Sequence, residues 1–443
     1  MLDLNIAFGA FPVAIYTVSL AIMGLLLMHA IMRGRTDVAW LLASAVVGLG
    51  AAWLTMWIVV DLQNTFGGPL DPGSYGWIYA GFAGLGVSLR ALFTFRAWSK
   101  IVPALGAILF LVSATLGVNA AYGLTPTLAS FLHISTSKIV VLPALNGAAN
   151  ATSGATSSAS SPLYVTWNPP ADMPAHGVTG VIAGGIPNEV SHFPARPAEI
   201  YLPPAALVAN PPTLPVVVLM MGEPGDPNPT IIAQTLEVFA QKNKGLAPIV
   251  VVVDQLTMPT FDPLCLDGPR GNADTYVSKD VVPWIAANLN VSKDRRDWTF
   301  AGFSNGGGCA AYFGAKYPET WGNILDVSGI EFAGFTEQKA VLTEEFGGDQ
   351  RAFDAIKPIN IMATQTYPDT VAIFTTGELD SKYGPGQEAV SKAAAAAGMN
   401  VTFKRLPGVA HNNTSLMLGL PIGFDVLFPR MGLSSPTAAP VTK

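Results

Sequence analysis

Charged residues are scarce in this chain. Asp, Glu, Lys and Arg make up only 12% of its 443 residues, whereas hydrophobic residues make up 50%. The formal net charge is -6, and no run of basic residues occurs outside two short loops. Binding to nucleic acid needs clustered Lys and Arg that neutralise phosphates, so the composition argues against a nucleic-acid partner.

Cysteine and histidine are also rare, with two cysteines and five histidines in the whole chain. Their spacing matches no zinc-binding pattern, because structural zinc sites draw on four Cys or His ligands in closely spaced pairs. We therefore expect neither a metal nor another cofactor.

Long apolar stretches are abundant, by contrast, and they are confined to the first 122 residues. The four that approach bilayer length are residues 11–32, 38–60, 77–95 and 101–122. About 20 apolar residues are enough for a helix to cross the hydrocarbon core, so the sequence predicts four transmembrane helices in residues 1–122. A cleavable signal peptide is the weaker interpretation of the first stretch, since MLDLN lacks a basic segment and three more apolar stretches come after it.

The charges of the connecting loops predict an orientation. Arg33 and Arg35 lie between the first two apolar stretches, and Arg96 and Lys100 lie between the last two. The middle loop carries acidic residues and no basic one. Basic loops stay in the cytoplasm, so both termini should lie outside. We expect a multi-pass protein of the plasma membrane whose remaining chain is extracytoplasmic.

A change of composition separates the apolar region from the rest of the chain. Residues 123–162 include the small, uncharged run NGAANATSGATSSASSP and are predicted to be a linker. Short β-rich runs then alternate with helical segments over residues 163–430, and residues 431–443 are predicted to be a flexible tail. Expected strands are 198–202, 214–221, 248–253, 298–303, 324–327, 371–375 and 401–406; expected helices are 229–241, 275–289, 306–317 and 387–397. This alternation predicts a doubly wound α/β domain with a mainly parallel sheet.

The sequence GFSNG, residues 302–306, carries the strongest catalytic signal. It follows the apolar run WTFAGF and opens a helical segment. A tight strand–turn–helix junction of this kind exposes a serine hydroxyl at the sheet edge, and glycines allow the close packing that the turn requires. We therefore predict that Ser304 is a nucleophile.

A nucleophilic serine needs a base and an acid. His411 is the only histidine after Ser304, and it follows an expected strand. The chain order serine, acid, histidine then places the acid on a loop between them. Asp380, just after the expected strand 371–375, is our choice; Glu378 is the second candidate and Asp326 the third.

Two backbone N–H groups should stabilise the oxyanion that forms during attack on a carbonyl. Asn305, the residue after the nucleophile, should supply one. The loop that begins Met221-Gly222-Glu223-Pro224 follows an early strand and should supply the other. Pro224 has no N–H, so the donor is Gly222 or Glu223, and we favour Glu223. A plain structural turn is the alternative.

Cys265 and Cys309 should lie on the same, extracytoplasmic side of the membrane. Oxidising surroundings favour a disulfide between them, and free buried thiols are the alternative. Such a bridge would join the loop after strand 248–253 to the helix that follows Ser304. Residues 329–357 lie where this kind of fold usually inserts a cap over the site.

Residues from about 192 to 420 resemble the putative-esterase branch of the α/β hydrolases. This branch includes esterase D-like enzymes, feruloyl esterases and secreted mycolyltransferases. The resemblance rests on ARPAEIYLPP, LPVVVLMMGEPG, DTYVSKDVVPWI, AGFSNGG, FTTGELD and PGVAH. It implies that Ser304, Asp380 and His411 form the triad, with Glu223 and Asn305 as oxyanion donors. Many relatives have His-Gly in place of Met221-Gly222, and the membrane helices resemble a subgroup of actinobacterial envelope proteins.

These observations favour a membrane-anchored serine esterase or acyltransferase that works through an acyl-enzyme. A lipidic ester of the cell envelope is the expected substrate, since the domain is tethered at a membrane, and mycolyl-type transfer is one form the reaction could take. A non-catalytic envelope protein that retains the fold as an interaction module is the alternative from another class. In a third hypothesis, the helices themselves bind or move a lipid on which the domain acts.

Overall fold

The chain forms two compact units, residues 1–136 and residues 137–443, in the computed structural model. The structure describes residues 4–63, 70, 72–122, 127–131, 138–143, 161–258 and 261–436. The uncharged run of the expected linker lies almost wholly outside these described residues, as does most of the expected tail.

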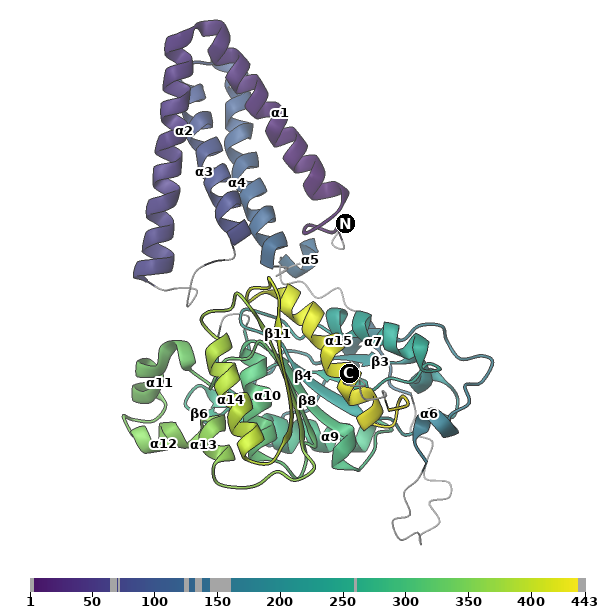
Figure 1. Cartoon of the computed structure of the whole chain (residues 1–443). Helices are drawn as coiled ribbons and strands as arrows, with labels where there is room; N and C mark the ends of the chain where they lie inside the picture. Colours follow the sequence, from purple (N-terminus) through teal and green to yellow (C-terminus); the bar gives the residue numbers. More distant parts are fainter. Residues whose placement is uncertain are drawn as a thin grey trace, which may run out of the picture. The chain divides into compact units, whose positions relative to one another are not determined.

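The N-terminal unit is a group of long helices that run side by side (Figure 1). Its long helices are α1 (Ala10–Arg33), α2 (Arg35–Met56) with its π-helical continuation η1 (Trp57–Leu62), α3 (Pro72–Leu92) and α4 (Ile101–Tyr122), and it also contains the short segments η2 (Ala97–Lys100) and α5 (Leu128–Phe131). Among the described residues, three segments are long and apolar enough to cross a membrane: Ala10–Arg33, Arg35–Leu62 and Ala97–Ala121.

The expected third span corresponds to α3, which is not among those three. Its sequence, PGSYGWIYAGFAGLGVSLRAL, is rich in glycine and contains Arg90, and both features lower its mean hydropathy. The structure therefore supports an N-terminal region of apolar helices. That four of them cross the membrane stays a prediction.

Small residues let these helices approach closely. A Cβ at Gly48 of α2 would lie 2.3 Å from the Phe82 carbonyl oxygen of α3, and a Cβ at Gly81 would lie 2.6 Å from the Ala114 Cβ of α4. Packing at small residues is how apolar helices associate when no water is present to drive them together. Arg90 of α3 also forms an ion pair of 3.1 Å with Asp37 of α2.

The C-terminal unit is built on a nine-stranded sheet in the order β1-β2-β3-β5-β4-β8-β9-β10-β11. All neighbours pair in parallel except β2 with β3 and β3 with β5. The strands are β1 (Ile139–Val140), β2 (Val178–Ile182), β3 (Glu199–Leu202), β4 (Val216–Met220), β5 (Ile249–Val252), β8 (Trp298–Phe303), β9 (Asn323–Val327), β10 (Val371–Gly377) and β11 (Asn400–Leu406); β6 (Asp267–Gly268) and β7 (Gly271–Asn272) form a separate hairpin.

Helices cover both faces of this sheet. They are α6 (Leu163–Thr166), η3 (Pro204–Leu207), α7 (Thr230–Lys242), α8 (Ala273–Thr275), η4 (Tyr276–Val281), α9 (Val282–Asn288), η5 (Arg295–Asp297), α10 (Asn305–Lys316), η6 (Phe335–Glu337), α11 (Gln338–Glu344), α12 (Gln350–Ala355), α13 (Pro358–Met362), α14 (Gly384–Ala396) and α15 (Asn413–Arg430). The predicted α/β class with a mainly parallel sheet is confirmed. The expected helix 275–289 consists of α8, η4 and α9, and the expected cap region holds η6, α11 and α12.

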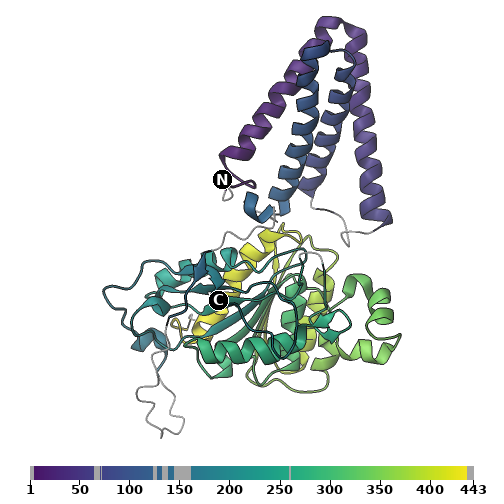
Figure 2. The same cartoon turned by 180° about the vertical axis from the view of Figure 1, so that it is seen from behind.

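The side chains of strand β9 show which helices cover each face of the sheet. Successive side chains of a strand point to opposite faces of a sheet. A Cβ at Gly314 of α10 would lie 2.3 Å from Ile324 of β9, and a Cβ at Gly423 of α15 would lie 2.5 Å from the adjacent Leu325. Helices α10 and α15 therefore press on opposite faces, and α15, drawn in yellow, is seen across the strands from α14 in both views (Figures 1 and 2).

Candidate active site

Ser304 sits on a sharp turn between β8 and α10, at the carboxyl edge of the parallel strands. Its backbone φ of 55° is unusual for a residue other than glycine. The turn is tight because a Cβ at Gly302 would lie 1.9 Å from the Gly306 oxygen, and a Cβ at Gly306 would lie 2.1 Å from the Met220 oxygen. The two glycines thus allow the helix to start directly against the sheet.

The structure brings Ser304, His411 and Asp380 together. Ser304 Oγ lies 2.7 Å from His411 Nε2, and His411 Nδ1 lies 2.6 Å from Asp380 Oδ2. Ser304 and Asp380 are buried, with exposed fractions of 9% and 4%. Because a carboxylate only accepts hydrogen bonds, Nδ1 carries the proton and Nε2 is left to accept one from Ser304.

The surroundings of Asp380 favour its ionised form. Burial raises the pKa of this carboxyl. The hydrogen bond and charge of His411, together with the backbone N–H groups of Tyr383 and Gly384, lower the pKa by more than burial raises it, so the net pKa lies below the usual value. The Tyr383 N–H donates to Asp380 Oδ1 at 2.9 Å. A carboxylate in these surroundings stays charged and holds the orientation of the imidazole ring.

The other two acid candidates have different partners. Glu378 is exposed, and its Oε2 accepts a hydrogen bond of 3.0 Å from the Gly408 N–H. Asp326 is buried on β9, where its Oδ1 accepts a bond of 2.7 Å from Gln387 Nε2. Burial raises the pKa of Asp326 to about 7, although hydrogen bonds from Gln387 and from the Gly329 backbone oppose this shift.

The two segments expected to supply oxyanion donors flank the nucleophile. Asn305 begins α10 and is buried. The loop after β4 packs on the turn, because a Cβ at Gly222 would lie 3.1 Å from the Ser304 Cβ. Next in this loop is Glu223. Partial burial, together with the negative charges of Asp262 and Glu337, raises the pKa of its carboxyl to about 7, against an opposing effect of Arg270.

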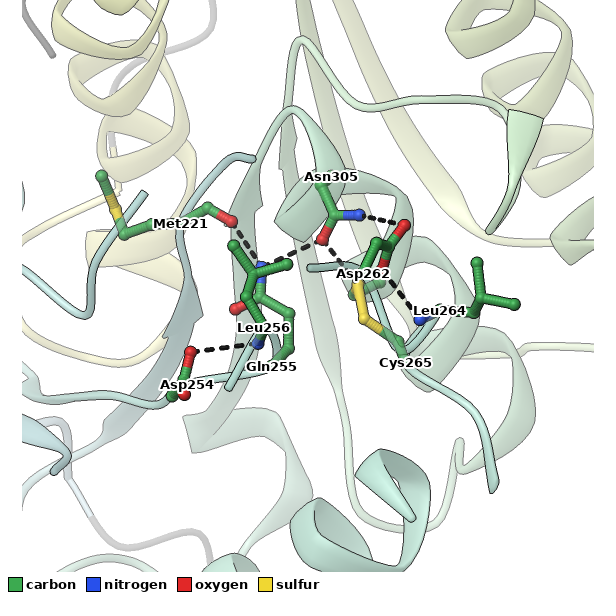
Figure 3. Close-up of a disulfide and its surroundings, with 9 residues drawn as sticks. Met221, Asp254, Gln255, Leu256, Asp262, Leu264, Cys265 and Asn305 are labelled. Atoms are coloured by element: carbon green, nitrogen blue, oxygen red, sulfur yellow. Dashed lines mark hydrogen bonds between the residues drawn. A yellow bond between two sulfur atoms is a disulfide. The ribbon is translucent and has the colours of Figure 1, made fainter. Parts of the chain in front are cut away.

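The expected disulfide between Cys265 and Cys309 is present (Figure 3). It joins the loop after β5 to the helix that starts at Asn305. The same loop reaches the expected cap, since Arg270 forms ion pairs of 3.0 Å with Glu344 and 3.1 Å with Glu345. The Cys265 loop is therefore tied both to the nucleophile helix and to residues 329–357.

Three further residues near the site were not identified from the sequence. The Tyr383 ring lies 4.4 Å from the His411 ring, and the side chains of Gln255 and Asp262 form hydrogen bonds with Asn305. Gln255 and Asp262 follow the end of an apolar strand, where polar residues of a parallel sheet gather. This position after an apolar strand is the sequence feature that could have marked them as candidate site residues. The described residues contain no group of three or more His, Cys, Asp or Glu side chains placed to hold a metal ion.

The sequence of this chain is similar to a known protein family and to a curated protein. Residues 195–382 match the family described as putative esterase. Ser304 and Asp380 lie inside that match, and His411 lies beyond it. An uncharacterised protein of Corynebacterium glutamicum is 29% identical over 433 residues, which cover 95% of each chain.

Solved structures of enzymes also resemble the chain. An S-formylglutathione hydrolase from Agrobacterium tumefaciens is 17% identical, with a TM-score of 0.46, and the match covers 59% of this chain and 98% of that one. A ferulic acid esterase is 14% identical, with a TM-score of 0.45 and coverages of 57% and 98%. FphF, a fluorophosphonate-binding serine hydrolase of Staphylococcus aureus, is 14% identical, with a TM-score of 0.44 and coverages of 57% and 98%.

Proposed function

We propose that the C-terminal domain, whose residues 195–382 match the putative esterase family, is a serine esterase or acyltransferase with Ser304 as its nucleophile. His411 takes the proton from Ser304 Oγ as that oxygen attacks the carbonyl carbon of an ester. Asp380 fixes the imidazole tautomer and stabilises the imidazolium. The observation that carries the proposal is the continuous hydrogen-bond chain Ser304–His411–Asp380, with distances of 2.7 and 2.6 Å.

The remaining steps involve the same groups. Negative charge that develops on the carbonyl oxygen is stabilised by the backbone N–H groups of Asn305 and Glu223. His411 then gives its proton to the departing alcohol, and the acyl group stays on Ser304 Oγ. Water or another hydroxyl, deprotonated by His411, attacks this acyl-enzyme and releases the serine.

We propose that the acyl group is lipidic. Apolar side chains are exposed close to the triad in sequence: Leu379, next to Asp380, is 57% exposed, and Met417 and Leu418 of α15 are 54% and 47% exposed. A contiguous exposed apolar surface favours an apolar ligand, and we propose that these side chains contribute to one. The apolar helices of the N-terminal unit add a second reason, since a membrane anchor holds the domain near lipids.

The proposed arrangement in the membrane is multi-pass, with the basic loops in the cytoplasm and the catalytic domain outside. It rests on Arg33, Arg35, Arg96 and Lys100, which all lie in the two loops assigned to the same side. An alkaline phosphatase fused after residue 436 should be active in intact cells, because this reporter folds only outside the cytoplasm. An inactive but stable fusion would reverse the orientation.

The catalytic proposal is tested with the full chain in detergent, with Ser304→Ala and with Ser391→Ala as a matched control. Ser391 is also a buried serine, and its hydroxyl donates only to the Glu388 carbonyl oxygen, at 2.8 Å, within α14. Each protein is treated with a fluorophosphonate probe and assayed on p-nitrophenyl esters of increasing chain length. We expect labelling and turnover in the wild type and in Ser391→Ala, and neither in Ser304→Ala.

The outcomes separate the parts of the proposal. A folded wild-type protein that is neither labelled nor active would favour the non-catalytic alternative. A rise of kcat/KM with acyl-chain length supports a lipidic substrate, and a steep fall with chain length would refute it. Addition of an alcohol that increases p-nitrophenol release without increasing release of free acid would identify transfer.

A further inference from the structure

Gln255 connects the two segments that are proposed to form the oxyanion hole. It follows β5 and is buried, with an exposed fraction of 2%. Its Nε2 donates to the Met221 carbonyl oxygen at 2.6 Å and to Asn305 Oδ1 at 3.0 Å. Met221 begins the loop after β4, and Asn305 directly follows the nucleophile, so one amide group joins both segments (Figure 3).

The direction of each hydrogen bond in this network is fixed by chemistry. A backbone carbonyl oxygen can only accept, so Gln255 must turn its NH₂ group toward Met221. The same NH₂ group then requires the oxygen of the Asn305 amide, which leaves the Asn305 NH₂ group for Asp262. Asp262 Oδ2 accepts from Asn305 Nδ2 at 2.9 Å, and its Oδ1 accepts from the Leu264 N–H at 2.7 Å. The Asn305 side chain is therefore held at both ends.

The packing around this network leaves little freedom for either segment. A Cβ at Gly306 would meet the Met220 oxygen at 2.1 Å and the Met221 oxygen at 2.8 Å, so the start of α10 lies directly against the end of β4. Preorganised donors stabilise an oxyanion only while they stay aimed at the position that it will occupy. The Gln255 amide adds a side-chain connection between the same two segments.

We propose that Gln255 is a positioning residue of the oxyanion hole: by bonding Met221 and Asn305 together it holds the two backbone donors at the spacing that the tetrahedral intermediate requires. This inference rests on the proposed function, because it assumes that Ser304 attacks a carbonyl. Gln255 touches neither the substrate nor Ser304 in this role; it acts through the segments that do.

The test compares Gln255→Met with Gln365→Met in the full chain in detergent. Methionine has a similar length and no donor. Gln365 matches Gln255 in its bonds, since its Nε2 also donates to a backbone carbonyl oxygen (Ala315, 2.8 Å) and to a side-chain oxygen (Tyr367, 2.9 Å). Ala315 lies near the far end of α10 from Ser304, about 15 Å along the helix at 1.5 Å per residue.

Four quantities are measured: kcat and KM on a p-nitrophenyl ester, the rate constant of fluorophosphonate labelling, and the Ki of an alkylboronic acid that mimics the tetrahedral intermediate. Removal of a whole oxyanion donor costs about 10²–10³ in kcat. For displaced donors we expect Gln255→Met to lower kcat about 10- to 100-fold, with KM nearly unchanged, and to slow labelling and raise Ki in parallel. Gln365 is exposed, so Gln365→Met should lose less thermal stability than Gln255→Met, and it should keep its kcat.

A second variant keeps the test decisive if Gln255→Met folds poorly. Asn305→Ala removes the acceptor of Gln255 and the donor to Asp262, while its backbone N–H stays in place. It should show the same loss of kcat, and the double variant should be little worse than either single one, because both changes break the same connection.

The inference and the proposed function fail in different ways. If Ser304 is labelled in the wild type and Gln255→Met is labelled at the same rate, the positioning role is wrong and the catalytic proposal stands. A loss of kcat that only follows the folded fraction, or one that Gln365→Met shares, also overturns the positioning role. A folded wild type that is never labelled at Ser304 overturns both.

Discussion

Removal of the Cys265–Cys309 disulfide should destabilise the C-terminal unit without abolishing the site. The informative variants are Cys265→Ala, Cys309→Ala and the double variant. Both cysteines are buried, with exposed fractions of 0% and 4%, so alanine at either position introduces no polar group into the core. Each of the three variants loses the same covalent bond.

The size of the effect depends on the length of chain that the bond closes. The two cysteines are 44 positions apart in the sequence. A cross-link of that span removes about 13 cal/mol/K of entropy from the unfolded chain, which corresponds to about 4 kcal/mol at 25 °C. For a large domain, about 2 °C of Tm per kcal/mol gives a fall of about 8 °C.

At a temperature where the variants are folded, their kcat should fall only slightly. The disulfide and the Asn305–Asp262 hydrogen bond join the same two segments, since Asp262 lies three residues before Cys265 and Asn305 lies four residues before Cys309. The hydrogen bond remains when the disulfide is removed. We expect kcat to fall a few-fold, less than the loss on removal of an oxyanion donor.

The assay is thermal unfolding of the full chain in detergent, followed by circular dichroism. All three variants should melt at the same temperature, about 8 °C below the wild type. Mass spectrometry under non-reducing conditions establishes that the bond is present in the wild type. If it is present and the double variant melts within about 2 °C of the wild type, the loop-entropy reasoning is refuted.

Further predictions concern the acidic residues of the site. Asp380→Asn should lower kcat by about 10⁴-fold by upsetting the His411 tautomer, whereas Glu378→Gln should stay near wild type; equal losses would contradict the assignment of the acid. The raised pKa of Glu223, about 7 against 4.5, means that folding favours its protonated form and that stability is lost as pH rises through this window. Glu223→Gln avoids that loss, so its Tm advantage over the wild type should grow between about pH 5 and about pH 8, and a constant difference would contradict the shift. Asp326→Asn should show the same trend, because its pKa is also raised, and should keep its kcat.

Most of the central sheet could be predicted because its strands are continuous apolar runs. The expected strand 298–303 coincides with β8, and the expected strand 371–375 lies within β10. Strands β1 and β2 were not predicted. β1 has only two residues and pairs with β2, which lies about 40 positions later in the sequence, and β2 in turn pairs with β3.

Helix α15 shows where local rules fail. It contains Pro421 and Pro429, and proline removes a backbone hydrogen bond and usually ends a helix. Leu420 and Phe424 of this helix are fully buried in the core of the C-terminal unit. Packing on the sheet outweighs the cost of the prolines here, and this balance cannot be read from the sequence.

Some residues of the candidate site could be predicted from the sequence and others could not. Ser304, Asp380 and His411 could be proposed from chain order and local context, and the structure brings them into hydrogen-bonding contact. For Gln255 and Asp262, the position after an apolar strand could have been noted, but their contact with Asn305 could not be predicted, because nothing in their own segments indicates it. Their contacts arise only when the loops after β4, β5 and β8 converge at one edge of the sheet.

The backbone at Ser304 sets the needs of chemistry against those of folding. A positive φ such as its 55° costs an ordinary residue about 1–3 kcal/mol, and glycine escapes most of that cost. Glycine at this position would therefore give a more stable folded state than serine. A protein carrying Ser304→Gly should be inert and yet survive heating better than its parent. Under the proposed function, the backbone conformation that exposes the Ser304 hydroxyl therefore lowers the stability of the folded chain.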